Sequence, residues 1–189
     1  MTRSSVGSAV GFAALFLFGF VAMNHFQTPA TASPGYAEAP EASEVLLVLL
    51  VDTGCVGSTD PALPEVWAEL VDRARETLPA SMDRVTTMGA VTSRNPEEGY
   101  EFLEPFGHFH EVVVGRRWSS AALRYMYRDL RGPATVPQVV VVHREFRRGA
   151  GGAMEASEER VLARYTGPEG MRRAADRLVV PDPAAWAER

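Results

Sequence analysis

A run of seven apolar residues followed by a turn-rich loop constrains this fold more than any other feature of the chain. Val45 to Val51 reads VLLVLLV, and the loop behind it reads DTGCVGSTDP. An uninterrupted apolar run of this length is typical of a strand that is buried on both faces of a sheet. The loop carries Cys55, the single cysteine of the chain. The sequence therefore predicts a central strand that ends beside one thiol.

Helical and extended patterns alternate after this loop. Apolar stripes at helical spacing, with capping residues and prolines at their ends, predict helices at about 64–78, 96–106, 119–131 and 168–178. β-branched and apolar runs predict further strands at about 84–91, 109–114, 136–146 and 160–167. The glycine-rich loop at 149–152 should join the last two strands as an antiparallel hairpin. This order indicates an α/β protein with a central mixed sheet covered by helices on both faces.

The two ends of the chain differ from this folded region. Residues 1–26 contain Arg3 and then seventeen uncharged residues, which is typical of a signal peptide or a signal anchor. Residues 27–43 are rich in Pro, Ala and Ser and predict a flexible linker, and residues 181–189 predict a tail. We expect a domain at 44–180 that lies outside the cytoplasmic membrane, either anchored or secreted, and in the periplasm if the source is bacterial.

The charge balance excludes one class of partner. The chain has 19 Lys and Arg against 24 Asp and Glu, a formal net charge of −5. Nucleic acids are bound by clustered positive charge, and the pairs Arg116-Arg117 and Arg147-Arg148 are isolated. We therefore expect no nucleic-acid partner. A single cysteine also excludes an internal disulfide.

Three features of the chain have to be considered together. The first is a buried strand that ends in a cysteine loop ahead of a helix. The second is Val136-Pro137-Gln138 before a valine-rich strand, and the third is the closing hairpin and last helix. Together they resemble the thioredoxin fold, and specifically the membrane-anchored thiol-disulfide oxidoreductases of the TlpA/ResA type, whose cis-proline element is similar to the second feature. The resemblance covers about residues 44–180.

The resemblance implies roles for four residues. Cys55 matches the attacking cysteine, and Ser58 stands where the family has its second, resolving cysteine. A cysteine at a helix N-terminus is stabilised as thiolate, and Ser58 could donate a hydrogen bond to it. Val136 and Pro137 would hold the substrate chain. A C-x-x-S site can form a mixed disulfide with a protein partner, but its release needs an external thiol such as glutathione. No cofactor is implied.

Several alternatives remain open from the sequence. Gly54 replaces the family's tryptophan before the motif, so the domain could be a non-catalytic binding or scaffold module with a degenerate site. His108 and His110 could bind a soft metal with Cys55 or His143, although polar loop histidines are the simpler interpretation. Asp52 could accept a proton from Cys55 or be a surface carboxylate. We expect no metal site.

Overall fold

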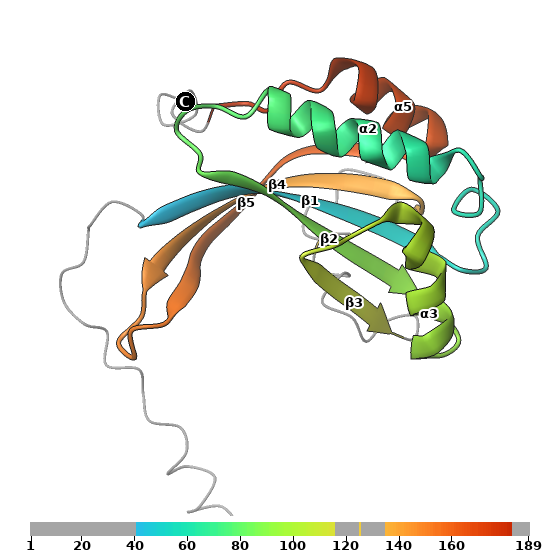
Figure 1. Ribbon diagram of the computed structural model, residues 1–189, viewed down its shortest axis with the longest axis horizontal. Coiled ribbons are helices and arrows are strands. Elements are labelled where there is room, and N and C mark those ends of the chain that lie inside the picture. Colours follow the sequence, from blue (N-terminus) through green and yellow to red (C-terminus); the bar gives the residue numbers. More distant parts are fainter. Residues whose placement is uncertain (1–40, 116–124, 126–134, 183–189) are drawn as a thin grey trace, which may run out of the picture. The chain divides into compact units, whose positions relative to one another are not determined.

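The computed structural model describes residues 41–115, 125 and 135–182 of the 189-residue chain. Within these residues, five strands form one mixed sheet in the order β3-β2-β1-β4-β5 (Figure 1). The strands are β1 (Ala42–Asp52), β2 (Arg84–Thr92), β3 (Glu111–Gly115), β4 (Gln138–Arg148) and β5 (Met154–Thr166). Strands β1, β2 and β3 are parallel, whereas β4 pairs antiparallel with β1, and β5 pairs antiparallel with β4. This arrangement confirms the predicted α/β class with a mixed sheet.

Strand β1 is the centre of the sheet, as its apolar run predicted. It pairs with β2 on one side and with β4 on the other. All seven residues from Val45 to Val51 are at most 1% exposed. Burial of this kind contributes about 1.5–3 kcal/mol for each large apolar side chain, so the run stabilises the fold through both of its faces.

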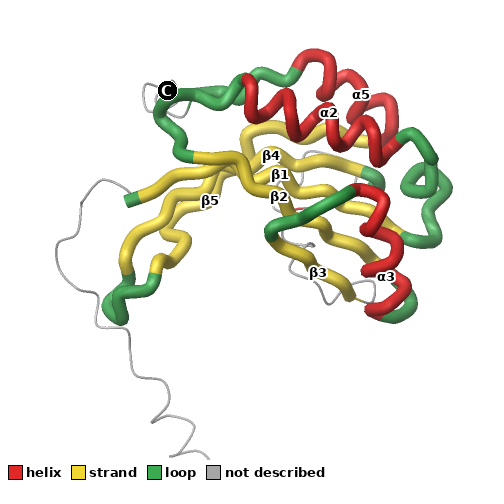
Figure 2. Tube along the Cα trace, viewed as in Figure 1, coloured by secondary structure: helices red, strands yellow, loops and turns green. Residues whose placement is uncertain are grey.

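The described helices pack on one face of the sheet. They are α2 (Leu63–Glu76), α3 (Pro96–Leu103), the short 3-10 helix η1 (Glu104–Phe106) and α5 (Gly167–Arg177). Val45, Leu47 and Leu49 point to this face and share one core with the apolar stripe of α2. Trp67 of α2 lies 5.6 Å, centroid to centroid, from the ring of Phe109. Figure 2 shows α2 and α5 lying side by side over the strands.

A second apolar core lies on the opposite face. Leu46, Val48 and Leu50 of β1 point to it, and Tyr125, which is 1% exposed, packs against them. The backbone oxygen of Tyr125 accepts a hydrogen bond of 2.7 Å from Arg164. The predicted helix at 119–131 otherwise lies outside the described residues, as do the predicted signal segment at 1–26 and most of the tail at 181–189.

The strands β1, β3, β4 and β5 differ from their predicted boundaries, and the largest shift is in β5. β5 begins at Met154 and therefore includes the acidic residues before Arg160, where the prediction began this strand. β1 begins at Ala42, two residues inside the predicted linker. Among the described residues, no helix is long and apolar enough to cross a membrane.

Candidate functional site: the Cys55 loop at the end of β1

The loop that follows β1 is held by a short series of backbone hydrogen bonds. Cys55 N donates to Asp52 O over 3.1 Å, and Cys55 O accepts from Ser58 N at 2.9 Å and from Thr59 N at 3.2 Å. Helix α2 begins only at Leu63, eight residues beyond Cys55. The expectation that Cys55 stands at the N-terminus of this helix is therefore wrong. Cys55 lies in a separate turn because two prolines, Pro61 and Pro64, delay the start of the helix.

The structure brings Cys55 together with the segment before β4. The Sγ atom of Cys55 donates a hydrogen bond of 3.3 Å to Val136 O, across 81 positions of the chain. The Val136–Pro137 peptide bond is cis, as the resemblance implied. A Cβ atom added at Gly57 would lie 3.0 Å from Pro137 Cδ and 3.9 Å from Cys55 Sγ, so only glycine allows this close approach. Cys55 is a free, half-buried thiol beside Val136 and Pro137.

The Ser58 side chain forms a hydrogen bond within the loop. Ser58 is 2% exposed, and its Oγ accepts a hydrogen bond of 3.2 Å from Asp52 N. Among the described residues, Ser58 Oγ has no hydrogen bond to the Cys55 sulfur. The hydroxyl group thus anchors the turn to the end of β1.

The Asp52 carboxylate binds the loop and the neighbouring strand. Its Oδ1 atom accepts a hydrogen bond of 2.8 Å from Gly54 N, and its Oδ2 atom accepts one from the Thr92 hydroxyl at the end of β2. These two bonds fix the turn after β1 against the neighbouring strand. The carboxylate therefore has a structural role. The sequence alone is compatible with a proton acceptor for Cys55 or with a surface carboxylate at this position.

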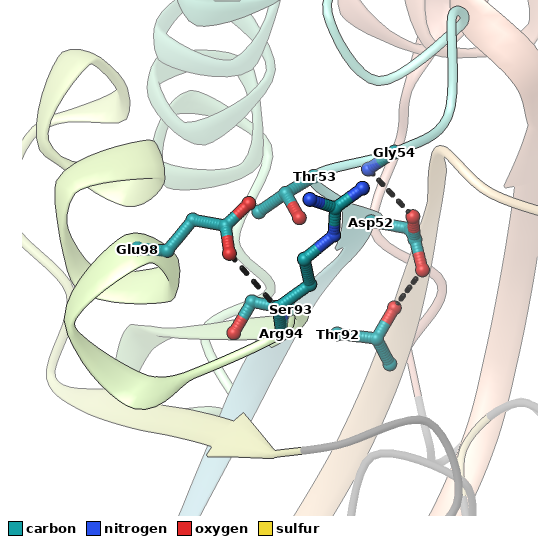
Figure 3. Close-up of a pocket in the computed structure, with 7 residues that line it drawn as sticks. All are labelled: Asp52, Thr53, Gly54, Thr92, Ser93, Arg94 and Glu98. Carbon is teal, nitrogen blue, oxygen red and sulfur yellow. Dashed lines mark hydrogen bonds between the residues drawn. The ribbon is translucent and has the colours of Figure 1, made fainter.

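A pocket of about 770 Å³ opens at the carboxyl ends of β1 and β2, and Gly54 is one of its lining residues. Figure 3 shows Arg94 reaching toward Thr53 and Gly54, with the carboxylates of Glu98 and Asp52 on either side. Glu98 Oε2 accepts a hydrogen bond of 3.3 Å from Arg94 N, and Glu98 N donates to the Asn95 side chain that caps α3.

Sequence reasoning missed Arg94 and Glu98 as site residues. The available signal was that Arg94 follows the second parallel strand and Glu98 lies in the first turn of the next helix. The carboxyl ends of adjacent parallel strands meet at one edge of a sheet. The fold and this edge define an α/β protein with one thiol beside a polar pocket.

The histidines do not form a metal centre with Cys55 in the described part of the chain, where no cluster of three or more potential ligands occurs. His108 and His110 lie edge to face, 5.6 Å between ring centroids, and His110 Nδ1 accepts a hydrogen bond of 3.1 Å from Thr87 N. His143 is 4% exposed. Burial lowers the pKa of His143, although the charges of Glu145 and Glu158 act in the opposite direction.

Comparison with protein-family models, with curated proteins and with solved structures gave no match.

Proposed function

We propose that this chain is an extracytoplasmic thioredoxin-like protein that exchanges thiols and disulfides through a single cysteine, Cys55. The contact between Cys55 Sγ and Val136 O, 3.3 Å, carries the proposal. The thiol and the proline segment are far apart in the sequence, and this contact brings them together. The TlpA/ResA resemblance assigns the proline segment to substrate binding. The order of the strands around β1 is compatible with that resemblance.

The proposed chemistry starts when the Cys55 thiolate attacks a disulfide of a partner. A mixed disulfide forms between Cys55 and one partner sulfur, and the other partner sulfur leaves as thiolate and takes up a proton. Ser58 has no sulfur and cannot displace the partner. Release therefore needs a protein thiol or a small thiol such as glutathione, and Val136 and Pro137 would hold the partner chain meanwhile.

The N-terminal segment supplies the proposed location. Residues 1–26 would direct the domain across the cytoplasmic membrane and either anchor it or be removed. A compartment in which disulfides form is the setting in which such exchange has substrates.

The competing proposal is a non-catalytic thioredoxin-like binding module that binds a partner at the same Val136–Pro137 segment. One observation favours it: the Cys55 sulfur is half-buried and its proton is engaged with Val136 O. A thiol held in this way would react slowly unless the loop opens.

The alkylation rate of Cys55 against pH separates the two proposals. Cys55 is the single cysteine, so iodoacetamide labelling of the folded full chain reports this site alone. We expect folded protein to be alkylated within a factor of about ten of the unfolded chain at pH 8. Labelling that occurs only after unfolding would support the binding module.

A further inference from the structure

The pocket at the ends of β1 and β2 lies next to the cysteine along the chain. Gly54 lines it and Cys55 is the next residue. Pockets for small ligands have volumes of roughly 300–1,000 Å³, and in sheets of this kind ligands bind outside the carboxyl ends of the parallel strands. The volume of about 770 Å³ suits a molecule of peptide size.

The residues that line this pocket are polar side chains and one glycine, and they carry both signs of charge. The lining consists of one cation, two carboxylates, three hydroxyl side chains and a glycine: Arg94, Asp52, Glu98, Thr53, Thr92, Ser93 and Gly54. The Asp52 carboxylate accepts hydrogen bonds from Gly54 N and from the Thr92 hydroxyl, and the Glu98 carboxylate accepts one from Arg94 N. A lining with an arginine between two carboxylates (Figure 3) is complementary to a ligand end that has an ammonium and a carboxylate on one carbon.

The chemistry of a single cysteine requires a second thiol from outside the chain. The proposed function needs this co-reactant, and the pocket is the neighbouring space in which one could bind. We propose that the pocket binds the α-amino-carboxylate end of a peptide-sized thiol, which then attacks the mixed disulfide at Cys55. This inference rests on the proposed function and names its co-reactant.

The geometry also sets the length of that thiol. The sulfur of Cys55 contacts Val136, which precedes β4. The pocket lies at the ends of β1 and β2, and β2 and β4 flank β1 on opposite sides. Neighbouring strands are about 4.8 Å apart, so the charged end and the sulfur of the ligand must be separated by several bonds. A γ-linked or peptide-linked thiol meets this requirement, and free cysteine is too short.

The exchange balances with two molecules of the small thiol. The first thiolate attacks Cys55 Sγ, forming a new sulfur–sulfur bond and breaking the bond to the partner, whose sulfur leaves as thiolate and is protonated. The second attacks the new disulfide at the small-thiol sulfur, which returns Cys55 to thiolate and forms the disulfide of the small thiol. The partner disulfide gains two electrons, and two small thiols lose one each.

A chromogenic mixed disulfide tests this inference directly. The full chain is treated with Ellman's reagent to join Cys55 to thionitrobenzoate, and release of the yellow thiol is followed after addition of glutathione, cysteine or 2-mercaptoethanol. Rates are compared per thiolate. We expect saturation with glutathione and a rate at least tenfold above that of the other two thiols.

Two variants connect that preference to the pocket. Arg94→Gln and Glu98→Gln should each lower the ratio of the glutathione rate to the 2-mercaptoethanol rate by about fivefold or more. Arg148→Gln removes the same charge from the exposed hairpin and should leave the ratio unchanged. Equal rates for all three thiols, or an unchanged ratio in both pocket variants, would overturn the inference alone. A folded chain that forms no adduct with Ellman's reagent would overturn the proposed function as well.

Discussion

Cys55 and Val136 are 81 positions apart, yet the sulfur of one donates a hydrogen bond of 3.3 Å to the backbone oxygen of the other. The contact joins the loop after β1 to the segment that leads into β4. It exists because β1 and β4 are neighbours in the sheet, so the end of one strand lies beside the start of the other. The thiol is thereby placed at the edge of the sheet beside Pro137, in the loop whose Gly54 lines the pocket.

The buried hydroxyl of Ser58 should act on stability rather than on the sulfur. Ser58→Ala leaves Asp52 N without its acceptor in a partly buried position, which we expect to cost about 1–3 kcal/mol. Urea unfolding of the full chain measures this, and Thr59→Ala, at an exposed position of the same loop, is the control. A variant of unchanged stability whose Cys55 alkylation slows several-fold would instead place Ser58 on the sulfur.

Gly57 should be intolerant of a methyl group. In Gly57→Ala the new Cβ lies 3.0 Å from Pro137 Cδ, which is backbone-fixed, so the loop has to move. Overpacking of this kind costs about 1–3 kcal/mol, and we expect the displaced loop to change the alkylation rate of Cys55. Gly151→Ala is the matched control, since no atom lies within 4 Å of its Cβ position. If both variants unfold at the same urea concentration, the contact between the loop and Pro137 is not tight.

Glu44 should be the most sensitive charged residue of the sheet. It is 1% exposed and accepts hydrogen bonds of 2.7 Å from Arg144 and 2.8 Å from Arg84. Burial alone would lower the pKa of Arg144, but its hydrogen bond to Glu111 and the charges of Glu44 and Glu111 outweigh this and raise it. Arg144 thus stays charged, and Glu44→Gln removes one of the two carboxylates that balance its positive charge.

We expect Glu44→Gln to lower the free energy of unfolding by about 3–5 kcal/mol, the usual cost of removing one partner of a buried pair. Glu76→Gln removes a carboxylate from an exposed pair with Arg73 and should cost at most about 1 kcal/mol. Urea midpoints of both variants provide the comparison. Equal midpoints would show that the Glu44 pair is not desolvated.

His143 should make stability depend on pH in one direction. Burial lowers its pKa in the folded state, so the unfolded chain binds a proton more readily. The contribution of neutral His143 is therefore fully present above about pH 6.5 and is lost as the pH falls toward the lower folded pKa. Urea midpoints between pH 7.5 and pH 5 should fall less in His143→Gln than in the wild type. His108→Gln, at an exposed position, should follow the wild-type curve.

Elements with strong periodic patterns can be predicted without the structure. This holds for the apolar run of β1, the amphipathic stripe of α2 and the valine-rich β4. A strand that is buried on both faces is apolar throughout, and a helix that is buried on one side has an apolar stripe. The start of β5 is harder to predict. Residues from Met154 to Glu158 are exposed, and exposed strand residues carry no apolar alternation.

The contacts within the candidate site could be predicted only in part from the sequence. The sequence could pick out Cys55, Ser58, Val136 and Pro137 as a group through a resemblance. It could not tell that the Ser58 hydroxyl accepts a hydrogen bond from Asp52 N. Arg94 and Glu98 gave no pattern of their own. They reach the pocket only because β2 lies parallel to β1, and pairing between distant strands is decided by packing rather than by local sequence.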